Sequence, residues 1–275
     1  MPIARINGTE IYYLIVGSGS PCLVMHGGLG GDHGCLHPWI DPLGDDLRLI
    51  YYDHRGNGRS GRPPLETMTY DQLAADADAL RAQLGFETVV VMGFSAGAAI
   101  ALHYALHYAQ HVTHLVLVGG HASWDYGDEI VAACERRGAT PQMMEAVNRL
   151  PRDDADLAEM VRGFMPLYLH HFDATLAEQY MSNVAWDAAA NIRYGELLQN
   201  YNLEPRLAEI RARTLIIVGR DDVITPLAQA ERLHHGIPDS ELVIFEHSGH
   251  LPYLEEPEEF FRVVRDWLDH ADDRR

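Results

Sequence analysis

The sequence of 275 residues contains no lysine, so its basic side chains other than histidine are all arginine. Lysine is the base of a Ser-Lys dyad, forms the Schiff base with pyridoxal phosphate and binds phosphate in the P-loop. None of these three arrangements is available to this chain. The absence of lysine therefore excludes several common kinds of enzyme site.

Positive charge is scarce overall. Lysine and arginine together number 21, aspartate and glutamate number 40, and the formal net charge is −19 at pH 7. Nucleic acids and anionic membranes both select proteins with clustered positive charge. The composition therefore argues against either partner, and the acidic excess is typical of a solvated surface.

Cysteines are few and long apolar runs are missing. The three cysteines, Cys22, Cys35 and Cys134, are odd in number and lack metal-ligand spacing, so we expect reduced thiols. No run of about 18 apolar residues occurs, and the start MPIARINGTE has neither a basic nor an apolar signal region. We expect a soluble, cytoplasmic protein.

Short apolar runs alternate with helical patterns along most of the chain. The runs predict strands at Ile11–Val16, Cys22–His26, Leu47–Asp53, Val89–Met92, Leu115–Val118, Thr214–Val218 and Glu241–Phe245. The helical patterns cover Tyr70–Leu84, Ala96–Ala109, Leu227–His234 and Pro257–Leu268. Such apolar strands are typical of a mostly parallel sheet covered by helices on both faces, so the predicted fold class is α/β.

One region breaks the alternation. Residues 123–205 contain helical stretches such as MMEAVNRL, DLAEMVRGFMPLYL and ATLAEQYM, with no convincing strand. This pattern predicts a helical insertion between two strands of the sheet. We therefore expect a core domain formed by residues 1–122 and 206–275, and a helical cap formed by residues 123–205.

The stretch VVVMGFSAGAAIAL places a single serine between two glycines inside an apolar run. A predicted strand leads into Gly93-Phe94-Ser95-Ala96-Gly97 and a helix follows at once. Gly-x-Ser-x-Gly in this context is typical of a nucleophile elbow, in which a strained turn presents the hydroxyl at the carboxyl edge of the sheet. Ser95 is therefore the candidate nucleophile.

A serine hydroxyl needs a base and an orienting acid, which follow it in the order Ser, Asp/Glu, His. In FEHSGHLPYLEEPEEF a loop after a strand presents His250 ahead of the last helix, with His247 as the alternative base. In TLIIVGRDDVITP two carboxylates, Asp221 and Asp222, follow another strand. We assign His250 as the base and take the acid from this pair.

The oxyanion of a tetrahedral intermediate needs two N–H donors. The N–H of Ala96 is one candidate, because it begins the helix after Ser95. The loop His26-Gly27-Gly28-Leu29-Gly30-Gly31 offers backbone with little side-chain obstruction. We assign Gly28 as the second donor, with Gly27 and Leu29 as alternatives.

Five motifs in this order resemble the α/β-hydrolase superfamily over nearly the whole chain. They are HGGLG, YYDHRGNGRSGRP, GFSAG, GRDDVITP and SGHLPYLEEP. The resemblance implies a Ser-His-Asp triad, with Asp222 as the acid because its spacing to Gly219 and Pro226 matches the family pattern. It also implies structural roles for Asp53 and Arg55.

Within the superfamily the chain resembles the proline iminopeptidase-like branch and its esterase relatives. It departs from iminopeptidases, which commonly have proline at the position of Leu29 and tryptophan at that of Ala96. A serine at the elbow, where dehalogenases of this fold have aspartate, implies an acyl-enzyme. We expect hydrolysis of small carboxylic esters or lactones, with an aminopeptidase as the alternative and a non-catalytic ligand-binding protein as the third hypothesis.

The substrate is expected to be a small acyl compound that contacts residues near the elbow and in the cap. The candidate substrate-binding residues are Leu29, Phe94, Trp124, Phe164, Tyr168 and Trp186, with Met165 and Leu167 as further apolar candidates. An aminopeptidase would also need a cap carboxylate for the ammonium group of its substrate. The available carboxylates are Asp173, Glu178, Asp187, Glu196 and Glu204.

Three histidines, His103, His107 and His111, recur every four residues in the helix after the elbow. They lack the glutamate of an H-E-x-x-H zinc motif, and no third-ligand loop is evident in the sequence. We expect surface or subunit-contact histidines, no metal site and no cofactor. A homo-oligomer is compatible with the sequence.

Overall fold

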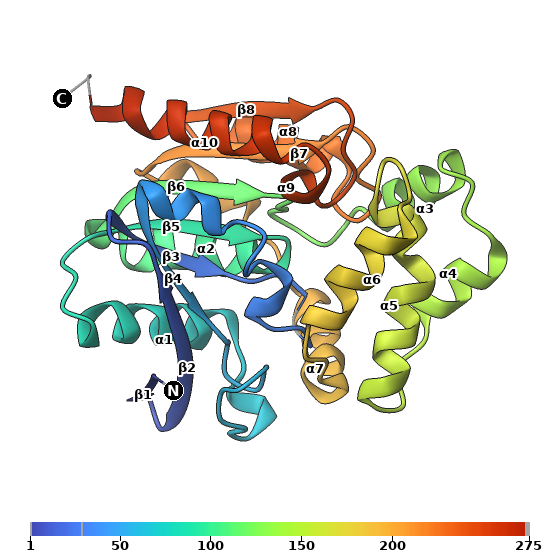
Figure 1. Ribbon diagram of the computed structural model, residues 1–275, viewed down its shortest axis with the longest axis horizontal. Helices are drawn as coiled ribbons and strands as arrows, with labels where there is room; N and C mark the ends of the chain where they lie inside the picture. The colour runs from blue at the N-terminus through green and yellow to red at the C-terminus, as the bar shows by residue number, and fades with distance from the viewer. Residues whose placement is uncertain (1, 29, 273–275) are drawn as a thin grey trace.

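The computed structural model of the chain describes residues 2–28 and 30–272. Its centre is one eight-stranded sheet, shown in Figure 1. The strands are β1 (Ile3–Ile6), β2 (Thr9–Val16), β3 (Ser20–Met25), β4 (Leu47–Tyr52), β5 (Val89–Phe94), β6 (Val112–Val118), β7 (Arg213–Gly219) and β8 (Ser240–Phe245). All seven predicted strands are present, and β1 is an additional strand that the sequence analysis missed.

The strand order in the sheet is β1-β2-β4-β3-β5-β6-β7-β8. β1 and β2 pair antiparallel, β2 also pairs antiparallel with β4, and every pair from β4 to β8 is parallel. The carboxyl ends of β3, β5, β6, β7 and β8 therefore meet along one edge of the sheet, where open α/β folds bind their ligands. The predicted mostly parallel sheet is confirmed.

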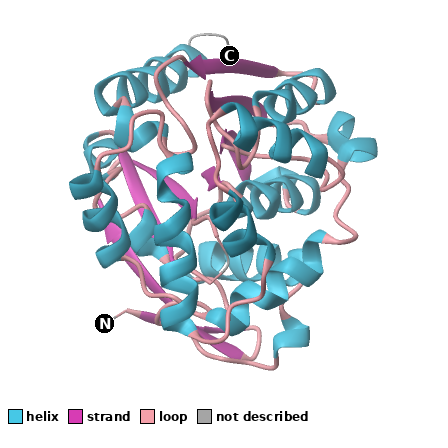
Figure 2. Cartoon of the chain, turned by 90° about the vertical axis from the view of Figure 1, so that its right-hand side faces the viewer, coloured by secondary structure: helices cyan, strands magenta, loops and turns pink. Residues whose placement is uncertain are grey.

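Helices connect the strands and cover the sheet on both sides (Figure 2). The α-helices are α1 (Tyr70–Gln83), α2 (Ala96–His107), α3 (Gly127–Arg136), α4 (Pro141–Asn148), α5 (Asp154–Tyr168), α6 (Ala174–Asn183), α7 (Ala188–Leu198), α8 (Leu227–Gly236), α9 (Pro252–Glu255) and α10 (Pro257–Asp272). The short 3-10 helices are η1 (His33–Cys35), η2 (Asp41–Asp45), η3 (Leu65–Thr67), η4 (Ala109–His111) and η5 (Glu204–Glu209).

Alternation along the strands divides the core into two layers. In β3, Leu23 and Met25 pack with α1, α2 and α8, whereas Cys22 and Val24 pack with α10 and the loop around η2. Successive side chains of a strand point to opposite faces, so a continuous apolar run such as β3 buries both faces at once. This burial explains why the strands show no polar alternation in the sequence.

Local sequence determines where several helices begin. Thr69, Asp153, Asp173 and Asp187 each accept a hydrogen bond from a backbone N–H in the first turn of α1, α5, α6 and α7, respectively. A side-chain oxygen at this position satisfies an N–H that the helix itself leaves unpaired. The apolar face of α10 then packs against the sheet through Phe260, together with residues one and two turns further on.

The helices α3 to α7 lie between β6 and β7 in the sequence and beyond the carboxyl ends of the strands in space (Figure 1). We refer to residues 123–205 as the helical segment. Its two ends meet, because the N–H of Trp124 donates to the oxygen of Tyr201 (3.1 Å) and the N–H of Leu203 donates to the oxygen of Ala122 (2.6 Å). The predicted helical insertion between two strands is confirmed.

The cysteines and the lengths of the helices can be compared with the sequence expectations. Cys22, Cys35 and Cys134 are buried and form no disulfide in the described chain. None of the helices within residues 2–28 and 30–272 combines the length and the apolar character that crossing a bilayer requires.

Candidate active site

Ser95 is the single residue between β5 and α2. Its φ of 52° and ψ of −119° lie in a region that residues other than glycine rarely adopt. A Cβ atom at Gly97 would collide with the carbonyl oxygen of Met25, and one at Gly93 would collide with that of Gly97. The two glycines therefore permit the strand and the helix to approach closely, which explains the Gly-x-Ser-x-Gly spacing around the strained serine.

This turn places Ser95 at the carboxyl edge of the sheet. Its N–H donates to the oxygen of Val118 at the end of β6 (2.8 Å), so the neighbouring strand holds the turn. Ser95 is half-buried and lines a pocket. Ala96, directly after it, begins α2, and its N–H belongs to the first turn, where backbone donors lack partners within the helix.

Asp222 and His250 form a buried pair at the same edge. Nδ1 of His250 lies 2.7 Å from Oδ2 of Asp222. The carboxylate also accepts hydrogen bonds from the N–H groups of Ile224 and Thr225 (2.8 and 2.9 Å) and from the hydroxyl of Thr225 (2.8 Å). An acceptor-only carboxylate requires the proton of His250 on Nδ1, which leaves Nε2 free to accept a proton.

The ring of His250 is held from several sides. The backbone N–H of His250 donates to the carbonyl oxygen of Tyr168 (2.6 Å), and the ring of Tyr168 packs edge-on against the imidazole at 5.3 Å between centroids. A Cβ at Gly119 would lie only 3.1 Å from Cε1 of His250. His250 and Ser95 line the same pocket, so the structure brings together the predicted nucleophile and the predicted base.

The two alternative residues lie elsewhere. His247 is exposed and its ring lies against His170. Asp221 accepts hydrogen bonds from Arg137 (3.0 Å) and from Nδ1 of His170 (2.6 Å), so it connects the end of β7 with the helical segment. The side chains of His247 and Asp221 therefore have partners of their own, outside the His250–Asp222 pair.

The glycine loop after β3 packs directly on the elbow. A Cβ at Gly27 would lie 3.0 Å from both the oxygen of Phe94 and Cβ of Ser95, and Gly28 has a positive φ of 45°. Gly28 lines the pocket. The glycine loop thus lies against Ser95, with no side chain at Gly27 or Gly28 to obstruct the pocket.

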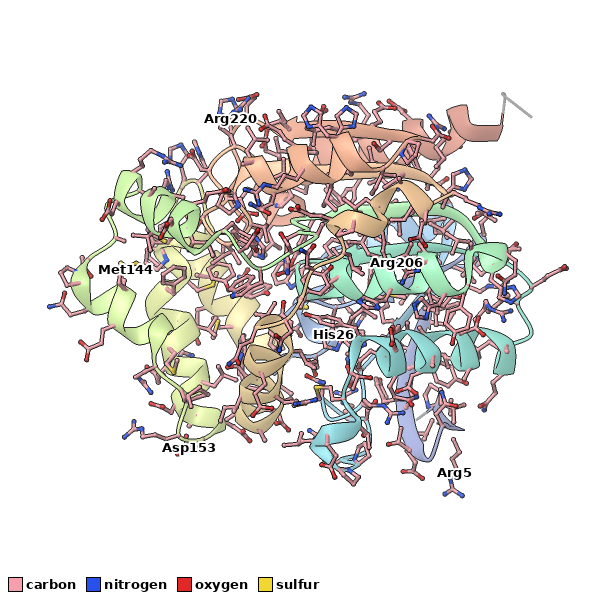
Figure 3. The ribbon with its side chains drawn as sticks, turned by 180° about the vertical axis from the view of Figure 1, so that it is seen from behind. Arg5, His26, Met144, Asp153, Arg206 and Arg220 are labelled. Carbon is pink, nitrogen blue, oxygen red and sulfur yellow. The ribbon has the colours of Figure 1, made fainter. Side chains whose placement is uncertain are left out.

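His26 fixes the start of this loop from the interior of the protein, between the helical segment and the helices α1 and α2 (Figure 3). Nε2 of His26 accepts from the N–H of His54 (3.2 Å), so Nδ1 carries the proton and donates to the oxygen of Gly27 (2.9 Å). Burial lowers the pKa of His26 to about 4, which keeps the ring neutral at pH 7.

The motif DHRGNGRS supports the glycine loop. Asn57 accepts a hydrogen bond from the N–H of Gly30 (2.7 Å), and Arg55 forms two hydrogen bonds with the buried carboxylate of Asp76 (2.6 and 2.7 Å). Asp53 accepts from the N–H and Nδ1 of His33 (2.9 and 2.7 Å). Asp53 and Arg55 therefore hold loops in place, as the resemblance implied.

The pocket at Ser95 has a volume of about 110 Å³. The loops at the sheet edge contribute Gly27, Gly28, Phe94, Ser95 and His250, and the helical segment contributes Val161, Tyr168, Tyr180, Val184, Trp186 and Asn191. Cys35, Leu36, Leu251 and Tyr253 close it further. Among the described residues, the lining contains no carboxylate and no arginine, so the pocket suits a small neutral group.

The predicted substrate-binding residues divide into three groups. Phe94, Tyr168 and Trp186 line the pocket. Phe164 is buried in a cluster with Cys134 and other core residues of the helical segment, and Trp124 is 38% exposed, so neither lines it. Leu29 lies outside the described residues.

The carboxylates of the helical segment have other partners and do not line the pocket. Asp173 and Asp187 cap helices, Asp187 also pairs with Arg62, and Glu178 and Glu196 pair with arginines on the surface. Glu204 accepts a hydrogen bond from the hydroxyl of Ser123 (3.0 Å). None of the five is placed to receive an ammonium group in the pocket.

A polar cluster that the sequence motifs did not predict lies beside the His250–Asp222 pair. The ring of His121 lies 5.3 Å from that of Tyr201 and 5.7 Å from that of Tyr126. Both ring nitrogens of His121 and the hydroxyl of Tyr126 are buried without a partner among the described residues. Burial and the nearby His250 lower the pKa of His121 to about 3, so the ring is neutral at pH 7.

Buried polar atoms of this kind require a partner, so the cluster can hold a water molecule or a polar group of a substrate. One signal for it was present in the sequence. His121 follows the predicted strand Leu115–Val118 by two glycines and therefore belongs to the same sheet edge as Ser95.

Within the part of the chain that the structure describes, two groups of side chains have ligand atoms close enough for a metal ion. The buried group is Asp32, His33 and Asp53. Burial would raise the pKa of Asp53, but the hydrogen bond and charge of His33 outweigh it and lower the pKa. With Arg59 also donating its N–H to Asp53 (2.7 Å), this group is an internally satisfied hydrogen-bond network. The other group lies on α1 and α2.

Comparison with known proteins supports the fold and the general chemistry. A family described as alpha/beta hydrolase fold matches residues 21–257. The chain is 32% identical to a proline iminopeptidase, PfmaB, of Pestalotiopsis fici, with 96% of this chain and 98% of the relative covered. It is 27% identical to a putative carbamate hydrolase, RutD, of Rhizobium rhizogenes, with 90% and 92% covered.

A solved structure resembles the chain over nearly its full length. The esterase EaEST from Exiguobacterium antarcticum superposes with a TM-score of 0.79 at 26% identity, covering 97% of this chain and 98% of the esterase. The relatives thus include proteins named for three different bonds, an ester, a carbamate and a peptide. The likeness therefore supports a hydrolase without selecting the bond that it cleaves.

Proposed function

The chain belongs to the α/β-hydrolase fold family, and on this premise we propose that it is a serine hydrolase of small carboxylic esters, lactones included. The observation that carries the proposal is the pocket itself. Ser95 and His250 line a small cavity whose described lining contains no carboxylate and no arginine, which suits a neutral acyl group. The esterase neighbour supports the same chemistry.

In the proposed mechanism Ser95 attacks the carbonyl carbon while Nε2 of His250 accepts the proton of its hydroxyl. The tautomer imposed by Asp222 leaves Nε2 available, and the carboxylate then stabilises the imidazolium that forms. Collapse of the tetrahedral intermediate expels the alcohol, which takes the proton from His250. Water repeats the sequence on the acyl-enzyme and releases the acid.

The oxyanion is stabilised by the N–H groups of Ala96 and Gly28. Ala96 contributes the positive end of α2, and Gly28 comes from the loop that packs on Ser95. Removal of one such donor typically costs about 3 kcal/mol of transition-state stabilisation. Since both donors are backbone groups, their position depends on the glycines and on His26 rather than on their own side chains.

The helical segment acts as a cap in this proposal. Val184 and Trp186 from it and Phe94 from the elbow surround the acyl group, and Tyr168 positions His250 through its carbonyl oxygen. Burial and the charge of Asp222 raise the pKa of Tyr168 to about 12, so its hydroxyl stays protonated and able to donate a hydrogen bond. The cap thereby excludes water and limits the length of the acyl chain.

An aminopeptidase is the second candidate, because the proline iminopeptidase relative covers nearly the whole chain. That activity needs an anionic partner for the substrate's amino group. The five candidate carboxylates of the helical segment are engaged outside the pocket by helix caps, by ion pairs or, for Glu204, by a hydrogen bond from Ser123, which favours the esterase.

The test compares initial rates of the purified protein and its Ser95→Ala variant on p-nitrophenyl esters from acetate to decanoate and on proline p-nitroanilide. We expect ester turnover that the substitution abolishes, with a preference for short acyl chains and no anilide cleavage. Preferred anilide cleavage would replace the esterase by the aminopeptidase. Inactivity toward every ester and the anilide would contradict both and favour a ligand-binding protein of this fold.

A further inference from the structure

Asp71, His103 and His107 form a cluster on the outer side of two adjacent helices. Asp71 lies in the first turn of α1, and the two histidines lie one turn apart in α2. Oδ1 of Asp71 is 2.9 Å from Nδ1 of His103 and 3.8 Å from Nε2 of His107. The potential ligand atoms of the three residues all lie within 4.8 Å of one another.

We propose that Asp71, His103 and His107 form a binding site for a divalent transition-metal ion, with Zn²⁺ as a suitable occupant. In a tetrahedral site with bonds of about 2.0–2.1 Å, neighbouring ligand atoms lie about 3.3–3.5 Å apart. The distances from Oδ1 of Asp71 to Nδ1 of His103 (2.9 Å) and to Nε2 of His107 (3.8 Å) fall on either side of this range. Small side-chain rotations would therefore produce the required geometry. The ion would replace the proton between His103 and Asp71, with His103 protonated on Nε2.

The third ligand comes from a different helix, which is why the spacing of the histidines alone did not indicate a site. α1 and α2 pack side by side. The third histidine of the sequence pattern, His111, is excluded, because α2 ends at His107 and Nδ1 of His111 lies 2.8 Å from the oxygen of Glu87. The helix thus supplies two ligands at spacing i, i+4, and α1 supplies the carboxylate.

The cluster is partly held in place and remains open to solvent. The ring of Tyr70 stacks on that of His103 at 5.0 Å with an interplanar angle of 11°. The side chains of His103, His107 and Asp71 are 13%, 35% and 68% exposed, respectively. A metal ion could therefore enter from solvent and keep a water molecule at its fourth position, as in zinc sites with three protein ligands.

The charges around the cluster are compatible with a cation. A nearby cation, Arg206 of η5, forms two hydrogen bonds with Glu209 (3.1 and 2.9 Å), and this carboxylate offsets its charge. The overall charge of −19 also attracts cations.

The ligand set selects among metals. Two imidazoles and one carboxylate suit Zn²⁺, Cu²⁺, Ni²⁺ and Co²⁺, whereas Ca²⁺ and Mg²⁺ prefer oxygen ligands alone. His103 lies eight residues after Ser95, which corresponds to about 12 Å along the helix. The ion would therefore link α1 to α2 and stabilise the fold, without contacting the reacting atoms.

The test is a Zn²⁺ titration of the full chain, stripped with EDTA, in competition with a chromophoric chelator. We expect one tight equivalent in the wild type, at least tenfold weaker binding in His107→Ala, a smaller loss in Asp71→Asn, and no change in His111→Ala. His111→Ala is a matched control, because it removes a histidine just beyond the end of the same helix.

Thermal unfolding gives a second readout. Saturating Zn²⁺ should raise the midpoint of the wild type and of His111→Ala, because a ligand that binds only the folded state stabilises it, and should leave His107→Ala unchanged. Equal midpoints of all variants in EDTA would verify folding, and His107→Gln replaces His107→Ala if the latter unfolds. Tight binding retained by the His107 variants, or lost equally in His111→Ala, would overturn the proposal. Ester hydrolysis does not enter either measurement.

Discussion

Two regions meet at the pocket and are built in different ways. At the sheet edge, Ser95 is fixed by a strained turn between two glycines, and His250 by hydrogen bonds to Asp222 and Tyr168. In the helical segment, the side chains of Val184 and Trp186 reach the pocket through apolar packing. Directional contacts specify a reacting geometry, whereas packing specifies a shape. We therefore expect substitutions at the edge to change rate and substitutions in the segment to change selectivity.

The largest effect should follow removal of the nucleophile. Ser95→Ala should lower kcat for esters on the order of 10⁴-fold or more, because the attacking oxygen is gone while the backbone donors remain. Alanine keeps the Cβ atom, so the urea concentration at the midpoint of unfolding should shift little. Labelling by a fluorophosphonate probe should disappear with the activity. Labelling that persists in Ser95→Ala would locate the nucleophile elsewhere.

The second largest effect should follow loss of the acid Asp222, and the adjacent Asp221 provides a matched control. Asp222→Asn should lower kcat on the order of 10³–10⁴-fold, because an amide no longer imposes the tautomer with Nε2 of His250 free. Asp221→Asn, one residue earlier, should keep most of the turnover, since Asp221 contacts Arg137 and His170 instead. Equal losses of turnover in Asp222→Asn and Asp221→Asn would mean that both substitutions act by destabilising this edge of the sheet, and not through the tautomer of His250.

A parallel comparison separates the two candidate bases. His250→Ala should be as inactive as Ser95→Ala, because these residues act as one unit. His247→Ala should retain most of its activity, since His247 is exposed near the start of the loop that follows β8. Steady-state kinetics on a short p-nitrophenyl ester measures both variants. A greater loss in His247→Ala would reverse the assignment.

In the helical segment, Trp186→Ala should enlarge the pocket and shift the preference among acyl esters. We expect kcat/KM for a longer chain relative to acetate to rise roughly tenfold or more, because even one methylene group in an apolar pocket discriminates by about this factor. Phe164→Ala is the contrast, since Phe164 is buried in the core of the segment. It should cost about 3–5 kcal/mol of stability and leave the chain-length preference unchanged.

The same contrast explains what the sequence could predict. Ser95, Asp222 and His250 belong to short motifs in which glycines and strand ends impose the local geometry, so their positions were predictable. Tyr168 and Trp186 line the pocket while Phe164 lies in the core of the segment, although all three are aromatic residues of the same segment. That division depends on how the helices α5 to α7 pack together.

Other features were not predicted from the sequence, because their signal is weak or depends on contacts between distant elements. β1 is only four residues long, includes Arg5 and pairs with β2 alone, so its apolar signal is weak. Val184 and Asn191 reach the pocket only because the helical segment folds back over the sheet edge. Asp71 joins His103 through the packing of α1 on α2. These particular contacts between distant elements were not predictable, whereas the local turns at Ser95, Asp222 and His250 were.

The smallest expected effect concerns Glu255, which connects the two regions. Its carboxylate accepts from the N–H of Gly249 in the His250 loop (2.7 Å) and from that of His170 in the helical segment (2.5 Å). Burial raises the pKa of Glu255 from about 4.5 to about 7, although these hydrogen bonds act in the opposite direction. The folded state therefore binds the proton more tightly than the unfolded state.

Stability contributed by this proton is fully present below about pH 4.5 and is lost as the pH rises through 7. Glu255→Gln cannot titrate and mimics the protonated form. The free energy of unfolding of the wild type, measured relative to that of Glu255→Gln by urea titration, should therefore decrease between pH 4.5 and 8. A difference that stays constant or grows over this range would show that Glu255 remains ionised in the folded protein. The two regions would then be joined by a charged contact, since the ionised carboxylate would still accept hydrogen bonds from both.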